Sequence, residues 1–255
     1  MLFTNLVQAN LKTRILGQQI EYYTRLKSTN AESWKIIDKG AQSGALIVTD
    51  NQFNGRGKAD RKWVASANKS LTFSILLFMD LDASISGWLP ILTGVAVQKA
   101  LLQFDLSVKL KWPNDLILDG RKVGGILCES KIKKTHLNQV VIGVGLNVNE
   151  TLDDFDPLLQ STATSFHIVT EKLYQRERVL AEILNELEKL IEGLPDNTSN
   201  VQSQWEIACN HMNKEVQFHC GKKIVKGIFK SLGESGSAVL NINGKESEYF
   251  SGEIA

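Results

Sequence analysis

Residues 55–63, GRGKADRKW, concentrate positive charge on a stretch that is too polar for a protein core. The four cationic side chains are Arg56, Lys58, Arg61 and Lys62. Gly55 and Gly57 leave backbone N–H groups open to the close approach of an anion. These features suit a phosphate or a carboxylate, although a solvated, charge-rich loop has the same composition. The segment is not a P-loop, because the pattern Gly-x-x-x-x-Gly-Lys-Ser/Thr is absent.

Two later stretches add residue types that suit the same chemistry. KWPND, residues 111–115, places Asn114 and Asp115 after a lysine, an aromatic ring and a proline, although an ordinary turn has this composition too. Lys122 stands just before the glycines 124–125, inside a strand pattern. Because glycine weakens a strand, the pair predicts a bulge or a ligand lying against bare backbone. A lysine beside such a site can neutralise a phosphate.

Two glycine-rich or polar motifs complete the set. GVGLNVN, residues 143–149, is superficially similar to a dinucleotide fingerprint, but the third glycine is missing and no helix pattern follows. Close approach of the backbone is the better explanation for Gly143 and Gly145. In KSTNAESW, residues 27–34, one of three polar residues serves as the N-cap of a helix, and capping does not explain all three. These three residues are Ser28, Thr29 and Asn30.

The elements around these motifs favour an α+β protein. Apolar runs at 44–52 and 69–78 predict two neighbouring strands, which the cationic loop joins. Residues 84–104 have a serine start and apolar residues on most faces, which predicts a largely buried helix. Asp119-Gly120 is a strong hairpin signal within 107–130, and 139–150 adds a further strand. A strand meander with few interposed helices favours a mixed, largely antiparallel sheet.

The second half of the chain predicts a boundary between two domains. Residues 170–194 predict an amphipathic helix, and 193–200 are a linker of turn-forming residues. Short strands with glycine-containing turns follow, which is typical of a small β-barrel. We therefore expect one domain over 1–200 and a second over 201–255.

Composition limits the classes of protein. The chain has 255 residues, 29 Lys and Arg and 28 Asp and Glu, so its formal charge of +1 predicts no nucleic-acid partner. The three cysteines are far apart and odd in number, which predicts buried free thiols and no metal site. No signal pattern and no apolar run near 20 residues stand out, so we expect a cytoplasmic protein without a membrane partner.

Taken together, five motifs resemble the biotin protein ligase family in type and order. They are STN at 28–30, Q-x-x-G-R-G at 52–57 with Trp63 following, KWPND at 111–115, RKVGGIL at 121–127 and GVGLNVN at 143–149. The resemblance runs from about residue 25 to the end. It implies a mixed, largely antiparallel sheet with flanking helices, similar to class II aminoacyl-tRNA synthetases and biotin synthetases. A small SH3-like barrel would follow the catalytic domain.

The resemblance also implies a two-step reaction. The biotin carboxylate attacks the α-phosphate of ATP, which gives biotinyl-5'-AMP and pyrophosphate. A lysine of a biotin carboxyl carrier domain then attacks the activated carbonyl. Mg²⁺ accompanies ATP, the protein supplies no metal site of its own, and the enzyme is a monomer or a homodimer.

By similarity, Lys122 and Arg56 are the expected catalytic residues, since they offset the repulsion between the two anions. Residues expected to contact biotin or its adenylate are Ser28, Thr29, Asn30, Gln52, Gly55, Arg56, Gly57, Lys58, Trp63, Lys122, Gly125 and Gly143. Residues expected at the nucleotide are Lys58, Trp63, Asn114, Asp115 and Asn147. The loop is expected to close over the adenylate and to protect it from water.

Some features depart from the family's pattern. Residues 58–60 read Lys-Ala-Asp where many members have arginines and a further glycine, and no arginine follows the terminal SGEI. About 25 residues precede the catalytic part, too few for a helix-turn-helix domain, so no operator binding is expected. The alternatives are a lipoate or octanoyl ligase and a protein that binds biotin or its adenylate without catalysis.

Overall fold

The computed structural model describes residues 1–58, 61–221 and 223–254. Its main part is a seven-stranded sheet with the strand order β1-β2-β5-β9-β8-β7-β6. The strands are β1 (Ile20–Tyr23), β2 (Leu46–Thr49), β5 (Leu71–Asp82), β6 (Lys109–Lys111), β7 (Asp115–Leu118), β8 (Arg121–Lys133) and β9 (His136–Leu146). β1 and β2 are parallel and the other neighbours antiparallel. The predicted mixed, largely antiparallel sheet is confirmed.

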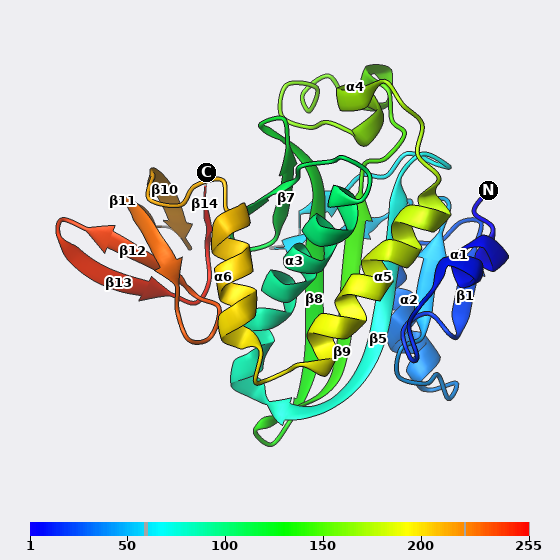
Figure 1. The fold of residues 1–255 in the computed structure, drawn as a ribbon, viewed down its shortest axis with the longest axis horizontal. Helices are drawn as coiled ribbons and strands as arrows, with labels where there is room; N and C mark the ends of the chain where they lie inside the picture. The colour runs from blue at the N-terminus through cyan, green and yellow to red at the C-terminus, as the bar shows by residue number, and fades with distance from the viewer. Residues whose placement is uncertain (59–60, 222, 255) are drawn as a thin grey trace.

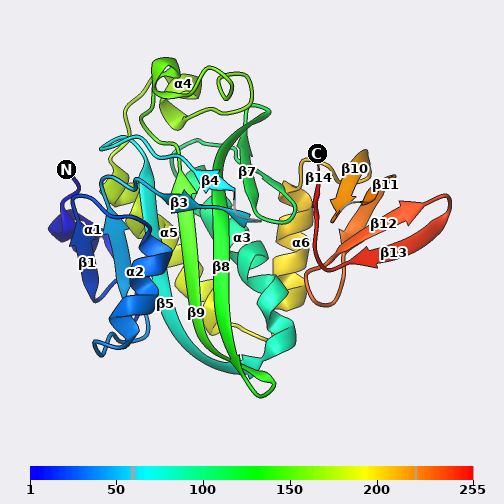
Figure 2. The same ribbon diagram turned by 180° about the vertical axis from the view of Figure 1, so that it is seen from behind.

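Helices cover both faces of this sheet. They are α1 (Thr4–Asn10), α2 (Thr29–Ile37), α3 (Trp88–Leu102), α4 (Phe166–Thr170), α5 (Arg176–Glu192) and α6 (Thr198–Ala208), with short 3₁₀ turns at Ala83–Gly87 and Leu152–Asp154. α3, α5 and α6 lie on one face (Figure 1). α2 lies on the other, together with the small hairpin of β3 (Gly55–Arg56) and β4 (Lys62–Trp63) (Figure 2). The second face is therefore the one on which the cationic loop lies.

The apolar helix α3 is the centre of the core. Ala83–Leu102 is the one segment of the described chain that is long and apolar enough to cross a membrane, judged by length and composition alone. The expectation that no apolar run approaches 20 residues is therefore wrong. The apolar surface of α3 is buried, because the helix packs against the sheet on one side and against α5 and α6 on the other.

The predicted strands and turns are largely confirmed. The chain passes from β2 to its neighbour β5 through the cationic loop, as expected. Asp119 and Gly120 both have positive φ values, 50° and 72°, and connect β7 to β8 in a tight hairpin. Twin positive φ angles match the right-handed twist of the flanking strands.

Two expectations about the second half need correction. The helix expected over 170–194 begins only at Arg176, because Ser165 caps the separate short helix α4 and Glu171, at φ 59°, ends it. The expected linker at 193–200 is partly helical, since α6 begins at Thr198. All three cysteines are free as expected, but each is partly exposed.

The C-terminal part is a five-stranded antiparallel sheet with the order β13-β12-β11-β10-β14. Its strands are β10 (Glu215–Cys220), β11 (Lys223–Leu232), β12 (Ala238–Ile242), β13 (Lys245–Tyr249) and β14 (Glu253–Ile254). Within the described residues β13 and β14 are edges, so the sheet is open and a closed barrel is not confirmed. Trp88 and Trp112 fasten this sheet to the core, since their indole N–H groups donate to the carbonyls of Glu234 and Gly236.

Candidate active site

A cavity of about 130 Å³ lies between the first turn of α2, the β3–β4 hairpin and strands β8 and β9. All of the residues predicted for the site line this cavity, except Gly55 and Asn147. The lining residues not singled out from the sequence include Thr72, Ile126, Leu127 and Val144. Motifs that are far apart in the chain therefore converge on one hollow.

The first turn of α2 forms an uncharged polar wall. Ser28 is the N-cap, and its Oγ accepts from the N–H of Ala31 at 3.4 Å. Thr29 donates its backbone N–H to Gln52 Oε1 at 2.8 Å, and its hydroxyl lies 3.2 Å from the same oxygen. Capping thus explains Ser28 alone, and the side chain of Thr29 helps to orient Gln52.

Asn30 is held from several sides. Its Oδ1 accepts from Ser74 Oγ at 2.6 Å, and its Nδ2 donates to the carbonyl of Leu127 at 3.2 Å and to Glu129 at 2.9 Å. Ser74 and Leu127 are the two cross-strand neighbours of Gly143. The amide of Asn30 therefore lies over the sheet at Gly143, and its orientation is fixed by the protein.

The glycines of the site have different functions. A Cβ atom at Gly143 would collide with Asn30 Oδ1, and one at Gly145 would collide with the Trp63 ring. Gly55 is absent from the cavity lining because it packs under Gln52 and the Trp63 carbonyl. At Gly125, by contrast, the nearest atoms to a Cβ would be 3.7 Å away, at the end of Lys122. Of these four glycines, Gly125 is the one where a methyl group would meet only ordinary van der Waals contacts.

The cationic loop folds as the β3–β4 hairpin. Gly55 pairs with Trp63, and Arg56 pairs with Lys62. The Trp63 ring covers Gly145, and its buried Nε1 has no partner among the described residues. The sequence departure expected at residues 59–60 lies outside the described residues.

Two cations of the loop contact the C-terminal strand. Lys58 Nζ donates to the carbonyl of Gly252 at 3.2 Å and lies 5.4 Å from the centre of the Trp112 ring. Burial lowers the pKa of the Lys58 ammonium. Arg61 forms an ion pair with Glu253 at 2.5 Å. The hairpin is therefore bounded by the C-terminal sheet as well as by the catalytic part.

Lys122 and Asp115 form an ion pair at the opposite side of the cavity. Their Nζ and Oδ1 atoms are 2.5 Å apart. A β-bulge between β7 and β8 places Lys122 here: Leu116 pairs with Gly124, but the next residue, Ile117, pairs with Lys122. The bulge that the adjacent glycines predicted is confirmed.

Comparison with known proteins identifies the family. Residues 22–147 match the model of the Biotin/lipoate A/B protein ligase family. Residues 22–147 belong to this family. The resemblance to biotin protein ligases that the five motifs indicated is confirmed.

Relatives in the ligase family cover different shares of the chain. The chain is 32% identical over 184 residues to "Bifunctional ligase/repressor BirA" of Bacillus subtilis, a match over 72% of this chain and 57% of that protein. It therefore spans little more than half the length of this relative. It is 26% identical to "Biotin--[acetyl-CoA-carboxylase] ligase" of Mycobacterium tuberculosis, over 97% of this chain and 94% of the relative.

Among solved structures of the family, the fold is similar to "Biotin protein ligase from Aquifex aeolicus in complex with biotin and ATP". The TM-score is 0.79 and the identity 26%, over 93% of this chain and 98% of that chain. The similarity therefore includes the C-terminal sheet.

A second hollow adjoins this cavity. It measures about 490 Å³ and shares Lys62, Trp63, Asp115 and Lys122 with the first. Asn147 lines this hollow and not the first cavity, and its Nδ2 donates to the carbonyl of Thr164 at 2.9 Å. The residues expected at the nucleotide are therefore spread over both spaces: Lys58 and Asn114 line the first, Asn147 the second, and Trp63 and Asp115 both.

Acidic groups are sparse at the first cavity. Asp115 is the one carboxylate that lines it in the described chain. No group of three or more His, Cys, Asp or Glu residues there is arranged to hold a metal. Mg²⁺ needs only one or two carboxylates when substrate phosphates complete its coordination, so Asp115 fits an ion that arrives with a nucleotide.

Proposed function

We propose that the protein is an ATP-dependent biotin protein ligase. One observation carries the proposal: uncharged hydrogen-bonding groups line one end of the cavity, and Lys122 stands at the other end, where the larger hollow begins. The polar wall suits the ureido head of biotin, whose N–H groups and carbonyl need uncharged partners. The carboxylate of biotin would then point toward Lys122, and ATP would occupy the larger hollow around Asn147.

The first step joins two anions, and the cations make this approach possible. A carboxylate oxygen of biotin attacks the α-phosphorus of ATP, the bond to the β-phosphate oxygen breaks, and pyrophosphate leaves. Lys122 stabilises the charge that grows on the α-phosphate. Asp115 orients the Lys122 ammonium through its ion pair. Mg²⁺ bound with ATP near Asp115 would neutralise charge on the phosphates.

The second step consumes the mixed anhydride. The neutral amine of an acceptor lysine attacks the carbonyl carbon of biotinyl-5'-AMP, an amide bond forms, and AMP leaves with its electron pair. The β3–β4 hairpin, with Trp63 over Gly145, would exclude water from the anhydride until the acceptor arrives. The acceptor class is a biotin carboxyl carrier domain, and a cytoplasmic location agrees with ATP as a substrate.

We also propose that residues 1–200 are the ligase domain and 201–255 a small domain of the SH3-like barrel type. The five antiparallel strands and their short turns support the barrel type. Helix α6 extends across the proposed boundary and packs on both α3 and β11. The two domains would therefore act as one unit around the loop.

Exchange of labelled pyrophosphate into ATP tests the first step. We expect exchange that depends on biotin, and none with lipoate or octanoate. Exchange with lipoate alone would assign the protein to the lipoate branch of the family. Tight binding of biotin without any exchange would show a binding protein, and either result would overturn the proposal.

A further inference from the structure

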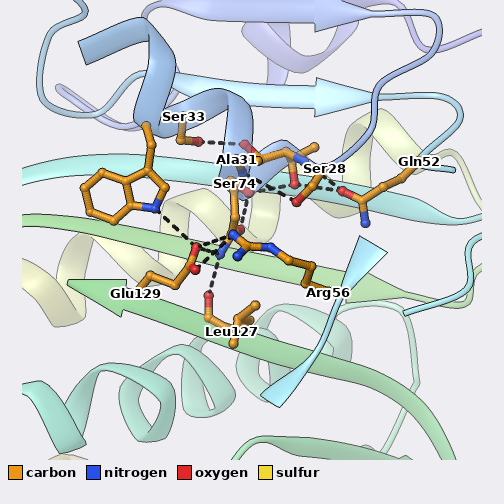
Figure 3. Close-up of polar contacts among 11 residues, drawn as sticks. Ser28, Ala31, Ser33, Gln52, Arg56, Ser74, Leu127 and Glu129 are labelled. Carbon is orange, nitrogen blue, oxygen red and sulfur yellow. Dashed lines mark hydrogen bonds and ion pairs between the residues drawn. The ribbon is translucent and has the colours of Figure 1, made fainter. Parts of the chain in front are cut away.

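The carboxylate of Glu129 joins three segments of the site. Glu129 lies on β8, two residues beyond the cavity-lining Leu127, and its side chain is 26% exposed. Its oxygens accept from Arg56 at 2.9 and 3.1 Å, from Asn30 Nδ2 at 2.9 Å and from Trp34 Nε1 at 3.2 Å (Figure 3). The hairpin, the first turn of α2 and the middle of α2 therefore share one acceptor.

The contact with Arg56 is the charged one. Hydrogen bonds between a guanidinium and a carboxylate are shorter and stronger than those between neutral groups. Figure 3 shows the Arg56 side chain, which comes from the β3–β4 hairpin, directed toward Glu129. The charge of Arg56 is therefore offset within the protein. The other cations that line the cavity are Lys58, Arg61, Lys62 and Lys122.

Through its hydrogen bond to Asn30, Glu129 helps to orient the polar wall formed by the first turn of α2. The Asn30 amide donates to Glu129 at one end and accepts from Ser74 at the other. Ser74 Oγ also lies 2.7 Å from the hydroxyl of Thr29, which in turn contacts Gln52. A continuous chain of hydrogen bonds thus runs from the hairpin through Glu129 to the groups that would hold the biotin head.

We propose that Glu129 is a positioning residue that fastens the closed hairpin and orients the polar wall at the same time. The inference rests on the proposed function for its ligand, and it gives Arg56 a positioning role in place of direct catalysis. Opening of the hairpin would withdraw Arg56 from Glu129 and weaken the restraint on Asn30. Loop closure and tight binding of the uncharged head are then one coupled event.

Trypsin cleavage after Arg61 in the substrate-free protein tests the fastening. Glu129→Gln keeps the size of the side chain and an acceptor for Asn30 and Trp34, but loses the charge. We expect cleavage to be roughly fivefold faster, since a partly exposed ion pair of about 1 kcal/mol is lost. Glu246→Gln makes the same chemical change at an exposed site on β13 and should leave the cleavage rate unchanged.

A double-mutant cycle separates coupling from general weakening. Arg56→Gln alone should accelerate cleavage by about the same factor, and Arg56→Gln with Glu129→Gln should be no faster than either single variant. Single effects that multiply in the double variant would overturn the proposal. If Glu129→Gln fails to fold, Arg56→Gln alone still decides, because the wild-type cleavage rate in that variant would overturn the proposal.

A kinetic arm tests the effect on the wall. In pyrophosphate exchange, Glu129→Gln should raise the biotin KM roughly tenfold and leave kcat within about twofold, because binding and not chemistry is affected. An unchanged KM with a lower kcat would overturn the proposal. If no variant, including wild type, exchanges with biotin, the proposed function fails while the cleavage arm still decides the role of Glu129.

Discussion

At the residue scale, three cations of the same site have different surroundings. Lys122 is paired with Asp115, Arg56 with Glu129, and Lys58 lies under the C-terminal strand with its pKa lowered by burial. Of these three cations, Lys122 is the one that borders both hollows, and it also contacts a carboxylate that can orient it. It is therefore the cation best placed to act on the reacting phosphate.

Substitution of Lys122 tests this assignment. Lys122→Ala should reduce adenylate formation at least about 100-fold, because removal of one transition-state contact costs on the order of 3 kcal/mol. The measurement is the rate of biotin-dependent pyrophosphate exchange. Lys133→Ala, at the exposed end of the same strand, is the matched control. A Lys122→Ala variant as active as this control would contradict the assignment.

Alanine substitutions at Gly143 and Gly125 are expected to affect stability differently. Gly143→Ala should destabilise the protein by about 1–3 kcal/mol, because the new methyl group collides with the fixed Asn30 amide. Gly125→Ala has room for its methyl group, so the unfolding midpoint should stay near that of wild type while biotin affinity falls. Thermal unfolding and calorimetric titration with biotin measure both effects. Equal unfolding midpoints for the two variants would show that the methyl group at residue 143 does not collide with Asn30.

At the element scale, local patterns predicted most strands but not every helix boundary. Asp119-Gly120 determined one hairpin, since positive φ angles are needed there and these residues adopt them readily. The start of α5 was misplaced because the polar residues before Arg176 fit a helix pattern equally well. The turn at Glu171 depends on a left-handed backbone that its residue type does not predict.

The sequence motifs predicted the residues that line the site but not the residues that hold them by hydrogen bonds. Polar and glycine-rich motifs identified the first turn of α2, the cationic loop and Lys122. Ser74 and Glu129 carried no local signal, because their importance comes from the pairing of β5, β9 and β8 around Gly143. Register between strands that are distant in the chain is not readable from one sequence.

A buried ion pair between Asp50 and Arg176 connects the end of β2 to the start of α5. Asp50, just after β2, accepts from the Leu2 N–H at 3.1 Å, from Tyr22 at 2.5 Å and from Arg176 at 2.8 Å. Asp50→Ala should destabilise the protein by about 3–5 kcal/mol, because Arg176 would be left as an unpaired charge that is only 6% exposed. Chemical denaturation measures the loss. Arg14→Ala, at an exposed ion pair, is the control and should leave the midpoint unchanged.

Acid should weaken the same contacts. Burial raises the pKa of Asp50, but the hydrogen bonds from Tyr22 and Arg176 outweigh it, so the net pKa lies below the ordinary value. A lowered carboxyl pKa contributes stability above the pKa of the unfolded chain, about 4, and the contribution is lost as the pH falls below it. Wild type should therefore lose more stability than Asp50→Ala between pH 5 and pH 3, values chosen to span that pKa of about 4. Equal losses would show that Asp50 does not contribute.

At the scale of the whole molecule, the C-terminal sheet reaches the loop that borders the cavity. Arg61 pairs with Glu253, and both side chains are about half exposed. Glu253→Gln should change the free energy of unfolding by less than about 1 kcal/mol. It should also release the adenylate several-fold faster, because the hairpin loses one of its contacts. Stopped-flow release of the adenylate measures this rate, and an unchanged rate would show that the C-terminal sheet does not restrain the loop.

In the proposed reaction, one cavity couples the acid group of biotin to a nucleotide and passes the activated acyl group to a lysine. Mass spectrometry of a biotin carboxyl carrier domain, incubated with the protein, ATP, Mg²⁺ and biotin, tests this most directly. We expect the carrier to gain the mass of one biotinyl group, and a carrier whose acceptor lysine is replaced by arginine to gain nothing. A carrier of unchanged mass, under conditions in which biotin is bound, would show that the protein does not transfer biotin.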